Sequence, residues 1–307
     1  MEEVKKTSIG GQALIEGILM RGPDKTAIAV RKPDGDIELR VDENEKKDSW
    51  TRKAPFVRGV FSLVDSLKLG MEAVMYSASF WEDEEDEEEE GGFLDKFLED
   101  KSEGFSNFII IGMSLVMSLV LFFFIPTLLG SLFTRFIDSS LGLNLIEGLI
   151  RVLVFLTYIT IVSKLGDMKR IFMYHGAEHK TIACYEHGRD LTVENIRPMS
   201  PYHPRCGTSF LFNVMIVSII ILSFFGWPNP LLRLLTRLAM LPVIAGITYE
   251  INKLVGRSDS VLARAISWPG KFVQKIASVK EPDDPMIEVA IAAMDPVIPE
   301  EEGKDLW

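Results

Sequence analysis

The sequence predicts an α-helical membrane protein, with four transmembrane helices in two hairpins and a small N-terminal cytoplasmic α+β region that contains a β-hairpin. Two observations predict this class. Hydrophobic residues make up 47% of the chain, but 25% is charged and the net charge is −11, so apolar and charged residues must lie in different segments. Residues 105–134 contain no charged side chain, and about 20 apolar residues are enough for a helix to cross the hydrocarbon core.

The first expected region, residues 1–81, begins with a glycine-rich stretch and a β-hairpin. Residues 26–41 alternate apolar and polar side chains on both sides of a Pro-Asp-Gly turn, which predicts the hairpin. The stretch ahead of it, GGQALIEGILMRGPD, is expected to be a turn-rich lead-in. It places two opposite charges, Glu16 and Arg21, among apolar residues.

A helix, an acidic linker and a C-terminal segment flank the predicted spans. Pro55 is suited to the first turn of a helix, and residues 55–80 present a wide apolar face, so this helix is expected to pack on the spans or to lie in the membrane interface. Residues 82–104 begin with a run of acidic side chains and are expected to form a solvated linker. Residues 252–307 are expected to be a cytoplasmic segment with one short helix and an acidic tail.

The transmembrane domain is expected to cover residues 105–251. After the first charge-free segment, three further apolar segments are long enough to span a membrane. The four predicted spans are 105–134, 141–162, 209–227 and 231–251. Lysine and arginine are concentrated between the second and third spans and after the fourth, whereas the turns within the two hairpins are almost free of them. This distribution predicts that both termini and the loop 164–208 are cytoplasmic.

The loop 164–208 holds every histidine and both cysteines of the chain. His175, Glu178 and His179 form the pattern H-x-x-E-H, whose members share one face of a helix. In the metalloenzymes that use this pattern, the two histidines bind zinc and the glutamate acts as general base. Because a cytoplasmic location keeps cysteines reduced, thiolate ligands are available as well. The loop therefore predicts a metal site with Glu178 as the catalytic residue.

A catalytic zinc site needs a third protein ligand and an open position. His203 and Cys206 rank first as additional ligands, because the two hairpins would bring together the ends of the second and third spans. His187 precedes a glycine and is expected at the surface or against a substrate, while Cys184 lies off the helical face of His179 and is expected to be a small buried side chain. Both stay as candidate site residues. A closed structural zinc site is the main alternative. Zinc is the expected metal, and manganese or iron is the alternative if only imidazole and carboxylate bind.

Charged residues also occur inside the predicted spans. Glu147 and Arg151 lie one helical turn apart in the second span. Charged side chains within a membrane usually face the interior of a bundle and pair, so these two are expected to satisfy each other. The alternative is that they line a polar path, which keeps both as candidate site residues.

Four segments of the sequence, GGQALIEGILMRGPD, HGAEHKTIACYEHG, HPRCGTSFL and EPDDPMIEVAIAAM, resemble the YqhQ family of bacterial membrane proteins, a domain of unknown function described as a predicted metal-dependent enzyme. The resemblance extends from Ile9 to about Met294. It implies that the first segment belongs with the site, which favours Glu16 and Arg21 as site residues. It also implies a bacterial membrane protein, and together with the four predicted spans this predicts a multi-pass protein of the bacterial plasma membrane.

Two functions of different classes agree with these predictions. The first is a membrane-bound zinc hydrolase whose site opens at the cytoplasmic face of the membrane, with the ligands and the general base described above. The second is a non-enzymatic membrane factor, such as an accessory of membrane-protein biogenesis or a small transporter, with a structural metal site. The expected partners are the lipid bilayer and a membrane-linked substrate or a partner membrane protein, and no nucleic acid is expected.

Overall fold

The chain folds as two compact units. The computed structural model describes residues 5–45, 49–81, 103–258, 260–301 and 303–306. The first unit, which we call the mixed unit, comprises Met1–Trp81, Tyr158–Val217 and Pro242–Trp307, and the second, the helical unit, comprises Glu82–Thr157 and Ser218–Leu241. Most of the predicted acidic linker, residues 82–102, lies outside the described residues.

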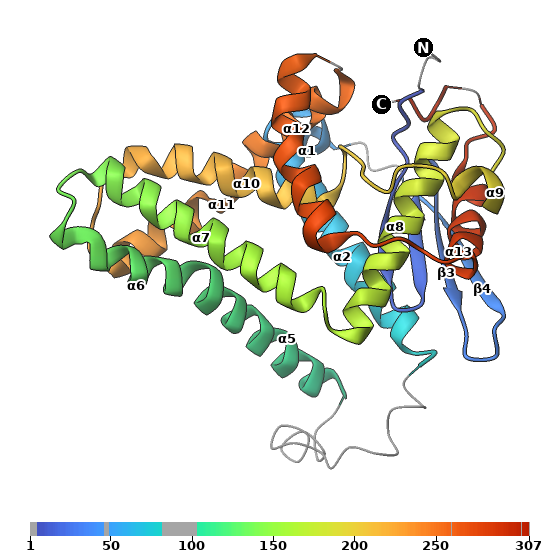
Figure 1. Ribbon diagram of the computed structural model, residues 1–307, viewed down its shortest axis with the longest axis horizontal. Coiled ribbons are helices and arrows are strands. Elements are labelled where there is room, and N and C mark those ends of the chain that lie inside the picture. Colours follow the sequence, from blue (N-terminus) through green and yellow to red (C-terminus); the bar gives the residue numbers. More distant parts are fainter. Residues whose placement is uncertain (1–4, 46–48, 82–102, 259, 302, 307) are drawn as a thin grey trace. The chain divides into compact units, whose positions relative to one another are not determined.

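Within the described part of the mixed unit, four strands form one antiparallel sheet in the order β1-β2-β3-β4 (Figure 1). The strands are β1 (Gly10–Leu14), β2 (Gly17–Arg21), β3 (Lys25–Arg31) and β4 (Ile37–Glu43). Strands β3 and β4 form the predicted hairpin, with Lys25 opposite Glu43 and Arg31 opposite Ile37. The prediction of a turn-rich lead-in is wrong, because two parts of this stretch, Gly10–Leu14 and Gly17–Arg21, pair with each other as strands β1 and β2.

The sequence does not predict strand β2, because both of its faces are buried. A strand that is covered on both faces has no alternation of apolar and polar residues, so it lacks the usual signal. Ile18 and Met20 point to one face of the sheet and Leu19 to the other, and all three are buried. Gly17 is also part of strand β2. Strand β3 lies so close to it that a Cβ atom at position 17 would be 2.7 Å from the carbonyl oxygen of Ala29, so this position in the sheet requires glycine.

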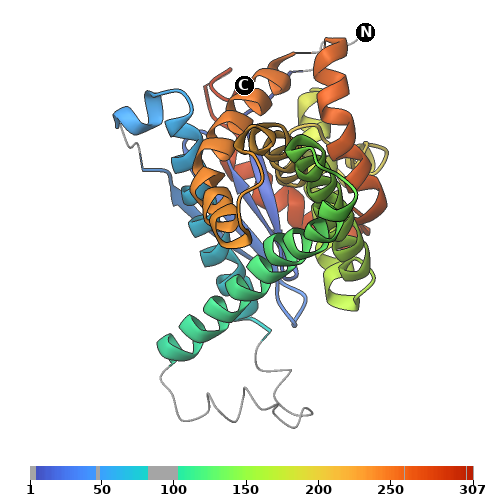
Figure 2. The same cartoon turned by 90° about the vertical axis from the view of Figure 1, so that its left-hand side faces the viewer.

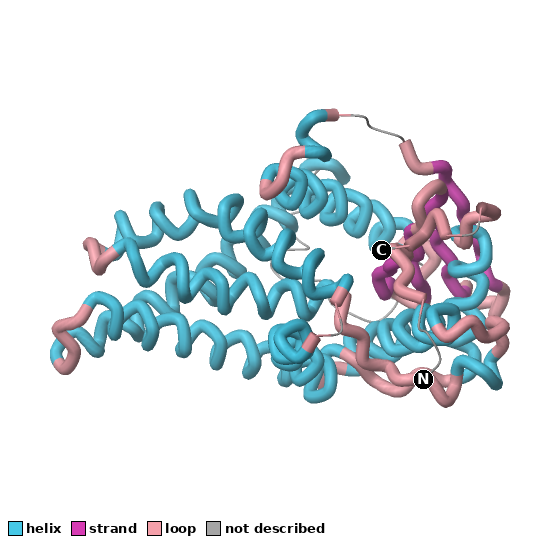
Figure 3. The backbone as a smooth tube through the Cα atoms, turned by 90° about the horizontal axis from the view of Figure 1, so that it is seen from above, coloured by secondary structure: helices cyan, strands magenta, loops and turns pink. Residues whose placement is uncertain are grey.

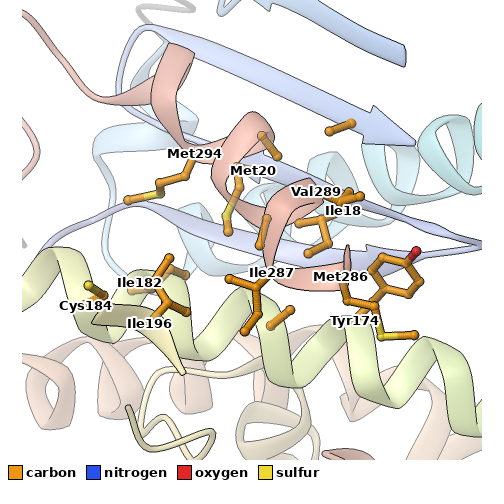
Figure 4. Close-up of a cluster of buried hydrophobic side chains, with 14 of the residues drawn as sticks. Ile18, Met20, Tyr174, Ile182, Cys184, Ile196, Met286, Ile287, Val289 and Met294 are labelled. Atoms are coloured by element: carbon orange, nitrogen blue, oxygen red, sulfur yellow. The ribbon is translucent and has the colours of Figure 1, made fainter. Parts of the chain in front are cut away.

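Helices cover both faces of the sheet. Helices α8 (Gly166–Glu186) and α13 (Asp284–Met294) pack on one face, and α2 (Val57–Ala78) packs on the other (Figure 2). The first face forms the larger apolar core, where Met286, Ile287 and Val289 of α13 gather with Ile18 and Met20 of β2 and with Ile182 of α8 (Figure 4). The second core joins Leu14, Leu19, Ile28 and Val30 to Ala73 of α2. The sheet is therefore the middle layer of three.

Helix α8 replaces the first half of the segment that was expected as a loop, 164–208. Its end is marked by Gly188, whose φ of 64° suits the left-handed position that follows many helices. Helices α2 and α13 match the two helices expected before and after the spans. The other short elements of the mixed unit are α1 (Trp50–Lys53), α9 (Val193–Ile196), α12 (Val261–Val273), a π-helical turn (Gln274–Ser278) and a 3-10 turn (Asp295–Val297).

Among the described residues, four helical segments are long and apolar enough to cross a membrane. They are Gly112–Arg135, Ser140–Val162, Gly207–Phe225 and Pro230–Arg257. The elements that form them are α5 (Glu103–Leu119), a π-helical turn (Val120–Phe124), α6 (Ile125–Ser131), a 3-10 turn (Leu132–Arg135), α7 (Ser140–Val162), α10 (Gly207–Leu222), a 3-10 turn (Ser223–Phe225) and α11 (Pro230–Arg257), drawn as cyan tubes in Figure 3. The helices agree with the four predicted spans to within two residues, except that α11 continues to Arg257, six residues past the predicted end of the fourth span.

A buried ion cluster lies in the helical unit around Glu147 of α7. The Glu147 carboxylate accepts hydrogen bonds from Arg151 at 3.0 Å, from Thr127 at 2.9 Å and from Arg237 at 2.6 Å. The Nε atom of Arg233 lies 3.7 Å from the same carboxylate. Glu147 and Arg151 therefore do contact each other, as the sequence indicates, and two arginines of α11 join them.

We predict that Glu147→Gln strongly destabilises the helical unit, because it leaves three buried guanidinium groups without a carboxylate. Breaking a buried ion pair from one side costs about 3–5 kcal/mol. Thermal unfolding of the detergent-solubilised protein measures the effect. The matched control is Glu72→Gln, which removes an exposed pair with Lys68 at 3.8 Å and should cost less than about 1 kcal/mol. Equal losses for the two variants would contradict this assignment.

Candidate metal site

Helix α8 brings the two motif histidines together. His175 and His179 lie on one face of the helix, with ring centroids 4.3 Å apart. Cys206, the residue just before α10, places its Sγ atom 3.1 Å from Nε2 of His175. One donor atom from each of these three residues lies within 4.8 Å of the other two. Two imidazoles and a thiol therefore form one group of possible metal ligands.

Backbone carbonyls orient both histidines. Nδ1 of His175 donates to the carbonyl oxygen of Ser278 at 2.8 Å, and Nδ1 of His179 donates to that of Pro201 at 2.7 Å. A histidine that donates through Nδ1 has Nε2 available as a ligand, and such outer hydrogen bonds are typical of metal-binding histidines. Two imidazoles and one thiolate are a donor set that suits zinc and leaves its fourth position open. The residues present therefore fit a zinc ion.

The electrostatics of the group favour the thiolate form of Cys206. Burial by itself raises the pKa of the Cys206 thiol, but the neighbouring His175 and His179 outweigh burial and hold it well below the usual range. For His175, burial lowers the pKa, but the Cys206 thiolate, Glu178 and the carbonyl of Ser278 together outweigh this effect and the net pKa is raised. The thiolate is the form of cysteine that binds metals and attacks electrophiles.

Glu178 lies beside the three possible ligands and is not part of their group. Its Oε2 atom is 3.9 Å from Nε2 of His175, and its Oε1 atom accepts a hydrogen bond from the backbone N–H of Gly11 at 3.0 Å. Burial raises the pKa of Glu178, against the opposing effect of the two histidines. Gly11 is required here, since a Cβ atom would lie 3.0 Å from Cγ of Glu178 and 2.5 Å from the carbonyl oxygen of Leu19.

A cavity of about 350 Å³ opens beside this group, and we call it the polar cavity. Its lining includes Gly11, Gln12, Arg21, His175, Glu178 and Cys206. Of the two charged residues in the glycine-rich segment, Arg21 lines the polar cavity. Glu16 does not line it, because its carboxylate binds Arg170 at 2.6 Å and the hydroxyl of Tyr174 at 3.0 Å.

The other histidines and cysteine lie outside the group of three. His203 lines the polar cavity, and its ring centroid is 5.6 Å from that of His179, but its Nε2 atom faces Glu186 at 3.5 Å. Burial lowers the pKa of His203, which favours its neutral form. Cys184 is buried in the larger apolar core (Figure 4), and His187 is exposed on the surface.

Sequence reasoning missed the residues that support the site from a distance. Gln274 holds the backbone of His203 through two hydrogen bonds, accepting from its N–H at 3.0 Å and donating to its carbonyl at 2.8 Å. Gly176 lets α8 approach the chain after the π-helical turn so closely that a Cβ atom would lie 2.0 Å from the carbonyl oxygen of Lys280. The only signal for Gly176 was its place inside the H-x-x-E-H motif.

Comparison with known proteins gives a family without an assigned activity. A family model described as "Protein of unknown function (DUF1385)" matches residues 54–300. The "Uncharacterized protein YqhQ" of Bacillus subtilis (strain 168) is 31% identical over 301 residues, which cover 94% of this chain and 92% of that protein. No solved structure shows significant similarity to the chain.

We predict that Gly176→Ala weakens the site although residue 176 is no ligand. The added methyl group meets a backbone carbonyl, which cannot rotate away, and overpacking of this kind costs about 1–3 kcal/mol. The chain that carries Ser278 and its hydrogen bond to His175 must shift as well. The control is Gly166→Ala at the start of α8, where no atom lies within 4 Å of the added Cβ. Thermal unfolding and bound metal, measured for both variants, should change only for Gly176→Ala.

Proposed function

Because the chain belongs to the DUF1385 family of proteins of unknown function, we propose its function from the site itself: a membrane-bound, metal-dependent hydrolase. One observation carries the proposal, namely that His175, His179 and Cys206 offer three ligand atoms within 4.8 Å of one another, beside the buried Glu178. Three ligands and a nearby carboxylate are what a catalytic zinc site requires. A closed structural site would need a fourth protein ligand.

Zinc is the metal that this donor set favours, since manganese and iron prefer sites without thiolate. A bound zinc ion would supply Lewis-acid chemistry that polarises a carbonyl or phosphoryl oxygen. His175 and His179 would hold it through Nε2, in the orientation that the carbonyls of Ser278 and Pro201 impose. Cys206 would hold it through the thiolate.

Glu178 acts as general base and then as general acid. It takes a proton from the attacking water, whose oxygen bonds to the carbonyl carbon or phosphorus atom of the substrate. The bond to the leaving group breaks, and Glu178 returns the proton to the leaving oxygen or nitrogen, so one water is consumed for each bond cleaved. The hydrogen bond from Gly11 fixes one carboxylate oxygen and leaves the other for this transfer.

The membrane location follows from the apolar helices. Four candidate spans support insertion into a bilayer, and Cys206 directly precedes one of them, α10. The outer face of α2 supports further lipid contact, because its exposed apolar residues repeat at helical spacing, at Phe61, Val64, Leu67 and Met71. The distribution of positive charges in the sequence supports a cytoplasmic position for the site and both termini, in the bacterial plasma membrane.

Bound metal, measured by mass spectrometry on the purified protein, tests the ligand set. We expect about one zinc per wild-type chain, in keeping with three ligands and one open position. His175→Ala and Cys206→Ala should lose it, whereas the matched control Cys184→Ala should keep it, because Cys184 lies in the apolar core. No metal in the wild type would refute the proposal.

Glu178→Gln tests the catalytic role. It should keep the metal and lower the rate of hydrolysis by about 10²- to 10⁴-fold, the usual contribution of a general base. Retention of metal together with full activity in a cell-based complementation assay would instead favour the non-enzymatic membrane factor.

A second candidate function is hydrolysis by a cysteine nucleophile. The 3.1 Å contact between His175 Nε2 and Cys206 Sγ favours it, because a thiol paired with an imidazole is the arrangement of cysteine hydrolases. Cys206 also caps α10, and its Sγ atom accepts a hydrogen bond from the N–H of Thr208 at 3.4 Å, as expected of a thiolate at a helix N-terminus.

Alkylation by iodoacetamide at neutral pH separates the two functions. If Cys206 binds a metal, it should resist alkylation in the purified protein and react only after a chelator is added. A catalytic thiolate without metal should react at once and with no effect of the chelator. In both cases Cys184 serves as internal reference, because burial raises the pKa of its thiol and slows its reaction.

A further inference from the structure

A second cavity, of about 340 Å³, adjoins the polar cavity at Cys206. The two cavities share four lining residues, Ser66, Arg205, Cys206 and Gly207. The second is lined mainly by apolar side chains, among them Leu63, Phe210, Tyr249 and Val255, and we call it the apolar cavity. The candidate metal site therefore stands between a polar space and an apolar one.

Small residues of α2 keep the apolar cavity open. Gly59, Ser62 and Ser66 repeat every three or four residues, so they lie on one face of the helix, and all three line the cavity. Gly59 is needed for the packing itself, since a Cβ atom there would lie 2.6 Å from Cβ of Tyr249 in α11. Larger side chains along this face would fill the space.

The walls of the apolar cavity come from the ends of two candidate spans. Gly207 and Phe210 lie in the first turn of α10, while Tyr249, Asn252, Lys253 and Val255 lie in the last turns of α11. A cavity at the ends of membrane spans meets the bilayer where acyl chains give way to headgroups. Its chemistry and its place both suit a lipid chain.

The polar cavity offers a cation for the other end of such a molecule. Arg21 lines it, and among the described residues its guanidinium group has no ion pair or hydrogen bond to a side chain or carbonyl. Arginine binds carboxylates and phosphates through its fixed fork of donors. Arg21 thus complements an anionic headgroup in the same cavity that Glu178 lines.

We infer that the ligand of this site is a single-chain or lipid-like anionic amphiphile, with its charged head at Arg21 and its chain in the apolar cavity. In this arrangement the bond between head and chain lies near Cys206 and Glu178. That the bond is cleaved rests on the proposed function, whereas the binding of the amphiphile does not.

Photolabelling with dodecyl phosphate that carries a diazirine near the end of its chain tests the inference. The full-length protein is labelled in detergent micelles, and the labelled peptides are mapped by mass spectrometry. We expect label within residues 59–66, 204–210 and 249–255. Unlabelled dodecyl phosphate should compete at concentrations at least tenfold below those of inorganic phosphate, which supplies only the head, or decanol, which supplies only the chain. Label confined to other parts of the spans, or equal competition by decanol, overturns the inference.

Two variants test the binding of the charged head and the binding of the apolar chain separately. Arg21→Gln should lower labelling at least fivefold by removing the cation, and Ser62→Leu should do the same by filling the apolar cavity. Ser79→Leu, which adds the same side chain at an exposed position just after α2, should leave labelling unchanged. If Ser62→Leu does not fold, the competition series with the wild-type protein still tests whether the chain binds in the apolar cavity. Competition by an apolar peptide but not by dodecyl phosphate would assign the cavity to a peptide and overturn the lipid assignment.

Metal content measured on the same samples keeps this inference apart from the proposed function. A protein that contains zinc but is not labelled in the apolar cavity refutes the amphiphile and leaves the hydrolase standing. A protein that is labelled as expected but contains no metal supports the amphiphile and refutes the hydrolase.

Discussion

The close contact between helix α8 and the chain at Lys280 is the constraint on which the site depends. Gly176 allows this contact, and it lies between the two histidines that approach Cys206. The same contact brings the carbonyl of Ser278 to His175, and Lys280 donates its backbone N–H to Phe172 at 2.9 Å. One side of α8 is thereby anchored to the apolar core, while the other is pressed against backbone groups that orient the imidazoles. A shift of the backbone at Gly176 therefore changes both the packing of α8 on the apolar core and the orientation of the imidazoles.

Two clusters of buried charge among the described residues, one around Glu147 and one around Glu178, are organised differently. In the helical unit, both carboxylate oxygens of Glu147 accept hydrogen bonds from arginines, namely Arg151 and Arg237. In the mixed unit, Glu178 has one firm hydrogen bond, to Gly11, and lines a cavity. Intramembrane charges that satisfy one another stabilise a bundle, whereas a buried carboxylate with spare capacity beside a cavity is suited to chemistry. This contrast favours the mixed unit as the place of function.

The parts of the fold that the sequence predicts are those with a local pattern. Periodicity or turn chemistry predicts four features: the hairpin, the helix at 55–80, the four apolar segments, and the shared helical face of His175 and His179. Strand β2 escaped because burial on both faces removes the alternation, and β1 escaped because two of its five residues, Gly10 and Gly11, are glycines, which are rare in strands. Arg21 lines the polar cavity and Glu16 does not. The carboxylate of Glu16 instead contacts Arg170 and Tyr174, which lie more than 150 residues away in the sequence. No spacing rule reports such contacts.

The support of the two histidines by main-chain carbonyls has a consequence for how this site evolves. Every residue has a carbonyl, so the hydrogen bonds to His179 and His175 do not depend on the identity of the side chains at positions 201 and 278. Selection acts there on the path of the backbone and not on the side chain. Two relatives with different residues at these positions can therefore share the same site, and a ranking of residues by invariance would overlook the carbonyls that orient the imidazoles.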